Sequence, residues 1–79
     1  MIKILLVDEN PRIRRGVRMR LALEPDFAII GEAGNGWEAL EQVRELCPDV
    51  VVTGFHLEGM DGISLTRRLQ RDFPTCAVI

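Results

Sequence analysis

Short apolar runs alternate along this chain with segments of helical periodicity, and this alternation limits the possible folds more than any other feature. The apolar runs cover residues 2–7, 27–30, 50–52 and 76–79. Strands that alternate with helices of about ten to fifteen residues are typical of right-handed βαβ units. We therefore expect an α/β fold of order βαβαβαβ, in which helices cover both faces of a parallel sheet and the strand at 50–52 is central.

Residues that favour helix starts stand before each periodic segment. Asn10 with Pro11 suits the beginning of the first helix, Asn35 with Gly36 the second, and Asp61 the third. Apolar side chains then recur at helical spacing, and we expect these to face the sheet: Ile13, Val17 and Leu21; Leu40, Val43 and Cys47; Ile63, Leu65 and Leu69. Arginines 14, 15 and 18 are expected mainly on the solvent side of the first helix.

Size and composition indicate one small soluble domain over residues 1–79. The hydrophobic content of 47% and the charged content of 28% are ordinary for a globular protein. A net charge of −2 gives no general attraction to nucleic acid or to an anionic membrane. No apolar run is long enough to span a bilayer. We expect a cytoplasmic protein whose Cys47 and Cys76 are reduced thiols.

The carboxyl ends of parallel strands form the functional edge of such a sheet, and three residues of interest fall there. Asp8 and Glu9 follow the first apolar run, and Gly54 follows the third. Two adjacent carboxylates offer the hard oxygen ligands that Mg²⁺ prefers. An acidic pair ahead of a helix also suits the helix dipole, so the pair alone leaves both interpretations open.

Several motifs together resemble the receiver domain of two-component response regulators, in its NarL/FixJ branch. They are Asp8 with Glu9, the run at 48–52, the loop at 59–62, and the segment 31–36 followed by Glu38, Ala39 and Leu40. The resemblance covers the whole chain and implies a flavodoxin-like fold. A complete receiver has five strands and five helices, so we expect a partial receiver that is truncated after its fourth strand.

The resemblance also implies a phosphorylation site with one part missing. In the family, the paired acids and a phosphoacceptor aspartate hold Mg²⁺ with a backbone carbonyl, here that of His56. The aspartate position is Gly54 in this chain, and Glu58 stands where the loop commonly has proline. Glycine has no carboxylate, so we expect neither phosphorylation at residue 54 nor enzymatic activity, and only weak Mg²⁺ binding at Asp8 and Glu9. Thr53 should point to the opposite face of the sheet and not replace the nucleophile.

Two functional hypotheses follow from this resemblance. The first is a pseudo-receiver that acts by protein–protein interaction, with a sensor kinase, another response regulator or a second copy of itself in a homodimer. The alternative is the receiver fragment of a DNA-binding transcriptional regulator whose helix-turn-helix domain is absent, the fragment itself making no nucleic-acid contact. We expect self-association because the fourth strand would be an edge, and apolar surface of the first and third strands would be open.

Other residues leave alternatives open. Trp37 suits an interface anchor or a partly buried aromatic at a helix start. His56 suits a ligand or an exposed loop residue. The arginines of residues 12–20 suit phosphate contacts or a solvated face paired with nearby acids.

Overall fold

Strands and helices alternate along the whole chain, as the sequence predicts. The computed structural model describes residues 1–54, 57 and 59–79. Its elements are β1 (Ile2–Val7), α1 (Pro11–Leu21), β2 (Phe27–Ala33), α2 (Gly36–Leu46), β3 (Val50–Thr53), α3 (Gly62–Asp72) and β4 (Ala77–Val78). Among the described residues, no helix is long and apolar enough to cross a bilayer. The expected cytoplasmic location stays a prediction.

All strand pairs in the sheet are parallel, and the strand order is β2-β1-β3-β4. β1 and β3 therefore lie inside the sheet, which confirms the central position predicted for β3. β4 follows β3 at one edge, where Ile79 N–H donates to the Val51 carbonyl at 2.9 Å. This order is the one that brings the carboxyl ends of β1 and β3 next to each other.

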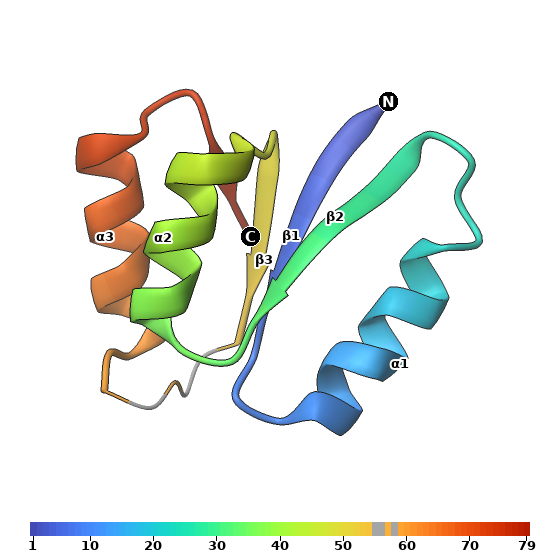
Figure 1. Ribbon diagram of the computed structural model, residues 1–79, viewed down its shortest axis with the longest axis horizontal. Helices are drawn as coiled ribbons and strands as arrows, with labels where there is room; N and C mark the ends of the chain where they lie inside the picture. Colours follow the sequence, from blue (N-terminus) through green and yellow to red (C-terminus); the bar gives the residue numbers. More distant parts are fainter. Residues whose placement is uncertain (55–56, 58) are drawn as a thin grey trace.

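Helices cover both faces of the sheet, with α2 and α3 side by side on one face and α1 on the other (Figure 1). Alternate residues of β1 point to opposite faces. Leu5 and Val7 join the main core cluster beneath α2 and α3, together with the fully buried Leu65 and Leu69. Leu6 faces α1 instead, where it lines a small cavity with residues of that helix.

The three predicted capping residues all accept a hydrogen bond from the first turn of their helix. Asn10 accepts from Arg12 N–H at 2.9 Å, and Asn35 accepts from Glu38 N–H at 2.8 Å. Asp61 accepts from Ser64 N–H at 2.7 Å. Each cap satisfies a backbone donor that the helix leaves without an internal partner, so the helix starts are confirmed.

The second strand is longer than its apolar run. It was predicted over residues 27–30, but parallel pairing with β1 continues to Ala33 past an irregularity in which Ile4 pairs with Ile29 and Leu5 with Gly31. Gly31 signals a close approach here and not a turn. A Cβ at this position would lie 2.5 Å from the Gln42 Oε1 atom of α2.

Three helix positions and one surface differ from expectation. Ile13 and Ile63, predicted to face the sheet, are each 51% exposed, and each lies at the rim of a cavity in the first turns of its helix. Cys47, also predicted to face the sheet, is exposed because α2 ends at Leu46 and Cys47 caps it at φ 50°.

The first strand was expected to leave apolar surface open, yet Ile4 and Leu6 are only 3% and 2% exposed. α1 packs on this side of β1, so the open apolar surface of the first strand is limited to its first residue, Ile2, at 40% exposed, while Val52 of β3 is half-buried.

The Asp61 cap generates a prediction about pH. Hydrogen bonds from Ser64 hold the pKa of the Asp61 carboxyl below its ordinary value of 3.8. A lowered pKa means that the ionised cap stabilises the fold above this value, and that the stabilisation is lost as the pH falls through the folded-state pKa. We expect Asp61→Ala to lower the unfolding temperature at neutral pH, whereas Asp61→Asn keeps an acceptor oxygen and loses the acid dependence.

Thermal melts followed by circular dichroism at neutral and acidic pH measure both effects. Asp26→Asn, at an exposed carboxylate before β2, is the matched control. An Asp61→Ala protein that melts like the unaltered chain at neutral pH would contradict the assignment of the cap.

Candidate functional site

The candidate site lies where β1 and β3 end side by side. Val7 pairs with Thr53 in the parallel register, and Gly54 N–H donates to the Val7 carbonyl at 2.7 Å. Asp8 N–H donates across to the Ala33 carbonyl of β2 at 3.1 Å. The backbone therefore places Asp8 directly beside Gly54, at the edge of the sheet predicted from the sequence.

The Asp8 carboxylate occupies the space in which a side chain at residue 54 would begin. A Cβ atom built on Gly54 would lie 2.5 Å from Asp8 Oδ2 and 3.1 Å from Asp8 Cγ. Contacts this short are not tolerated, so a larger residue at 54 requires the carboxylate to turn away. The other carboxylate oxygen accepts a hydrogen bond from Asn10 N–H at 2.9 Å, which holds Asp8 in this orientation.

The backbone itself does not call for glycine at position 54. The glycine with a left-handed conformation in the described chain is Gly59, at φ +76°. Gly54 lies outside that region, in conformations that other residues adopt readily. Glycine at residue 54 is thus explained by the closeness of the Asp8 carboxylate, and not by a strained turn.

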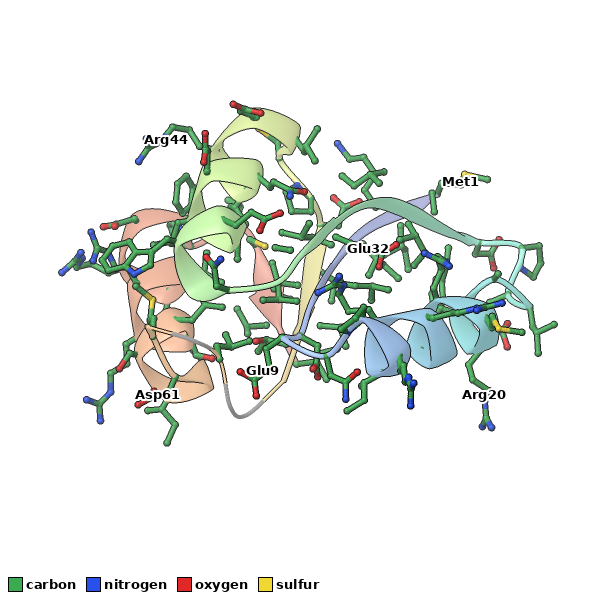
Figure 2. All side chains as sticks on the ribbon, turned by 60° about the horizontal axis from the view of Figure 1, so that its bottom comes forward. Met1, Glu9, Arg20, Glu32, Arg44 and Asp61 are labelled. Atoms are coloured by element: carbon green, nitrogen blue, oxygen red, sulfur yellow. The ribbon has the colours of Figure 1, made fainter. Side chains whose placement is uncertain are left out.

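The predicted metal ligands are only partly brought together. Glu9 is exposed in the turn between β1 and α1 (Figure 2), next in sequence to the half-buried Asp8. His56, whose carbonyl was the third predicted ligand, lies outside the described residues. Within residues 1–54, 57 and 59–79, no three acidic, histidine or cysteine side chains form a group that could hold a metal ion. Mg²⁺ binding at Asp8 and Glu9 stays a prediction.

Arg14 belongs to the site although the sequence placed it on the solvent side of α1. Its Nη1 donates to the Asp8 carbonyl at 2.6 Å and its Nε donates to Glu32 at 3.3 Å. Arg18 also pairs with Glu32, at 2.5 Å. Figure 2 places Glu32 on the strand beside α1, so this carboxylate ties β2 to the helix. The pairing confirms that these arginines serve nearby acids; only the folded chain brings residues 14 and 32 together.

Two cavities adjoin Gly54. The larger, about 450 Å³, lies toward α3 and is lined by Thr53, Gly54, Gly62, Ile63, Thr66, Arg67 and Ile79. The smaller, about 100 Å³, lies beneath α1. The Thr53 hydroxyl donates to the Gly54 carbonyl at 3.1 Å, and the Thr66 hydroxyl donates to the Gly62 carbonyl at 2.7 Å. Both hydroxyls therefore donate to backbone carbonyls of neighbouring residues.

Comparison with known proteins assigns this arrangement to a family. The family model described as the response regulator receiver domain matches residues 4–79. The chain belongs to the response regulator receiver family. This domain is 38% identical over 79 residues to the transcriptional regulatory protein LiaR of Bacillus subtilis, and 33% identical over 78 residues to the response regulator protein VraR of Staphylococcus aureus.

These relatives are longer proteins. The alignments cover 100% and 99% of this receiver domain, but only 37% of the length of LiaR and of VraR. The similarity is thus established for the receiver portion of each relative, and it confirms the NarL/FixJ character predicted from the motifs.

Solved structures confirm the flavodoxin-like fold. The receiver domain of NarL from Mycobacterium tuberculosis superposes with a TM-score of 0.91 at 28% identity, covering 98% of this chain and 62% of that one. The response regulator domain of CheB from Thermotoga maritima gives 0.92 at 27% identity, covering 99% and 57%. The chain therefore shares the fold of part of these receiver domains, although residue 54 is glycine.

The contact between Asp8 and position 54 generates a double-mutant prediction. A change from glycine to alanine at a compatible backbone position stabilises a protein by about 0.4–1 kcal/mol. In this receiver domain the added Cβ displaces the Asp8 carboxylate and breaks its bond with Asn10 N–H, which offsets that gain by about 1 kcal/mol. We expect Gly54→Ala to stabilise the Asp8→Ala background but not the unaltered chain.

Urea unfolding of the two single variants, the double variant and the unaltered chain gives the coupling energy. Gly16→Ala is a matched control, since a Cβ at Gly16 meets nothing within 4 Å. Strict additivity of Gly54→Ala and Asp8→Ala would show that the carboxylate does not occupy this space in solution.

Proposed function

We propose that this receiver domain acts without phosphoryl transfer to residue 54 and regulates by binding a protein partner. The observation that supports this most directly is the pair formed by Gly54 and Asp8. Residue 54 has no nucleophilic atom, and the space for one is taken by a carboxylate that is bonded to Asn10 N–H.

Phosphoryl transfer to a protein side chain needs a nucleophile placed in line with the phosphorus atom. The carboxylates near β3 are committed elsewhere. Asp49 accepts from Lys3 N–H at 2.8 Å at the opposite end of the strand, and Asp61 caps α3. With Thr53 and Thr66 also bonded to carbonyls, the described residues favour a binding role over a chemical one.

The candidate partners are a sensor kinase, another response regulator or a second copy of the domain. The exposed apolar side chains include Ile63 and Ile79, both of which line the larger cavity beside β4. Apolar residues gathered around a cavity at a sheet edge are typical of contact surfaces. We therefore place protein–protein interaction, not catalysis, at the centre of the proposed function.

A second candidate function rests on the relatives. LiaR is named a transcriptional regulatory protein, and this domain matches 37% of its length. The receiver would then control the DNA-binding part of a longer regulator. Mass spectrometry of the protein isolated from its own cells tests this: peptides from a helix-turn-helix region continuing beyond Ile79 support it, and a mature protein of 79 residues refutes it.

The phosphorylation part of the proposal predicts that the domain gains no adduct from a small phosphodonor. Incubation with acetyl phosphate and Mg²⁺, followed by intact mass measurement, should leave the mass unchanged. The matched variant is Gly54→Asp, which restores a carboxylate at the end of β3 and should gain the mass of one phosphoryl group, in a Mg²⁺-dependent reaction.

Peptide mapping locates any adduct. A phosphoryl group on the unaltered chain would refute the proposal, whichever side chain carries it. Failure of a folded Gly54→Asp variant to react would show that residue 54 is not the residue that accounts for the loss.

A further inference from the structure

The outer surfaces of α2 and α3 carry opposite charges. On α2 the exposed acids are Glu38, Glu41 and Glu45, and on α3 the exposed bases are Arg67, Arg68 and Arg71. Spacings of three and four residues keep the acids on one side of α2, and Arg67 with Arg71 on one side of α3. Arg68 lies toward α2, over Trp37. The buried residues of α2 and α3, such as Val43 and Leu69, lie on the opposite sides, against the sheet. We call this exposed surface the α2–α3 face.

The two helices lie next to each other (Figure 1), so an acidic row runs beside a basic row. Figure 2 shows Arg44 projecting from α2 away from the sheet. Together with Arg68 and Arg71, it contributes positive charge around Asp72, whose pKa is lowered first by its hydrogen bond with Arg71. Arginines therefore outnumber acids along the α3 side of the face.

An aromatic side chain lies beside this boundary between the two rows. Trp37, in the first turn of α2, is 54% exposed and lies under the Arg68 guanidinium, 5.4 Å from its ring centroid. Tryptophan and arginine are the residue types that most often dominate binding energy at protein interfaces. The face thus combines an aromatic anchor with two rows of opposite charge.

We propose that the α2–α3 face binds a second copy of this chain about a two-fold axis. A two-fold axis that lies in the interface, parallel to the two helices, turns the two copies of the face toward each other. It sets the acidic row of α2 against the arginine row of the partner's α3, and the reverse contact forms by symmetry. The same rotation brings each Trp37 under the partner's helices. This inference rests on the proposed function, because it names the partner of a domain that acts by binding.

The charge pattern selects a second copy over a nucleic acid. Phosphates would be drawn to Arg67 and Arg71 but repelled by the neighbouring Glu41 and Glu45, and the chain carries a net charge of −2. A second copy of the chain presents the complementary charge pattern, because it carries the same two rows of side chains. Electrostatic complementarity of this kind sets both the orientation and the rate of association.

The dimensions of the face indicate a weak dimer. Each helix has 11 residues, a length of about 16 Å. Two such helices cover less than the ~800 Å² per partner of a standard stable interface. We therefore expect an association that depends on concentration and that salt weakens, because its charge pairs are exposed.

Charge exchange tests the proposal. One variant carries Glu41→Arg and Glu45→Arg, which makes the face predominantly basic. The other carries Arg67→Glu and Arg71→Glu, which makes it predominantly acidic and also removes the exposed ion pair of Arg71 with Asp72. Glu38 is left unchanged because its carboxylate accepts from Gly34 N–H and from the Gln42 amide. Arg68 is left unchanged because it covers Trp37.

Sedimentation equilibrium at low salt should show the unaltered chain dimerising and each variant monomeric, with a dissociation constant raised at least about tenfold by like-charge contact. An equimolar mixture of the two variants should dimerise again. Since the chain has one tryptophan, a blue shift of its emission on mixing reports burial of Trp37 itself. Restored association in the mixture also shows that both variants are folded.

Ala77→Lys, at the exposed position of the edge strand β4, is the matched control and should leave dimerisation unchanged. Dimers lost in Ala77→Lys but kept in both charge variants would overturn the proposal in favour of edge pairing. An unaltered chain that stays monomeric would overturn it as well, while the absence of phosphorylation would still stand as a separate result.

Discussion

The parallel pairing of β1 with β3 is the constraint on which the rest of this receiver depends. It aligns Val7 with Thr53 and closes with the bond from Gly54 N–H to the Val7 carbonyl. Both strands end at the same edge of the sheet. Asp8 and Gly54, which are far apart in sequence, therefore become neighbours. The site therefore exists as a property of the sheet, and it persists when one of its side chains is removed.

What remains of that site works as a structural network. The Asp8 carbonyl accepts from Arg14, one carboxylate oxygen accepts from Asn10 N–H, and the other oxygen stands over Gly54. Arg14 reaches Glu32 in turn, so a single residue connects β1, α1 and β2. Through these bonds Asp8 ties the turn after β1 to the start of α1.

Sequence periodicity and capping were sufficient to predict the order of elements, the three helix starts at Asn10, Asn35 and Asp61, and the edge at which the site lies. Both signals depend on residues close in sequence, so they can be interpreted without knowledge of the fold. Residues whose roles depend on distant partners were harder to predict. The length of β2 depends on β1, because Gly31 looks like a turn until α2 packs against it.

The role of Arg14 and the orientation of Asp8 could not be predicted either, because both depend on partners that are distant in sequence. The sequence shows an arginine in a first helical turn and an acid at a strand end, and neither indicates that the arginine bonds the backbone carbonyl of the acid. Gly54 could be singled out from the sequence because the motifs around it resemble those of the receiver family. That Asp8 fills the gap could come only from coordinates, since side-chain orientation is set by the surrounding atoms.

The loss of the nucleophile also bears on how binding would be controlled. Gly59 and Met60, from the loop between β3 and α3, contact the start of α2: a Cβ on Gly36 would lie 2.9 Å from Met60 Sδ, and one on Gly59 would lie 3.4 Å from Trp37 Nε1. Gly59 and Met60 thus support the aromatic end of the α2–α3 face. Under the proposed function, no covalent phosphate at residue 54 is available to control binding. Binding through the face would then depend on protein concentration and ionic strength, because an equilibrium shifts only with a ligand or modification that distinguishes its states.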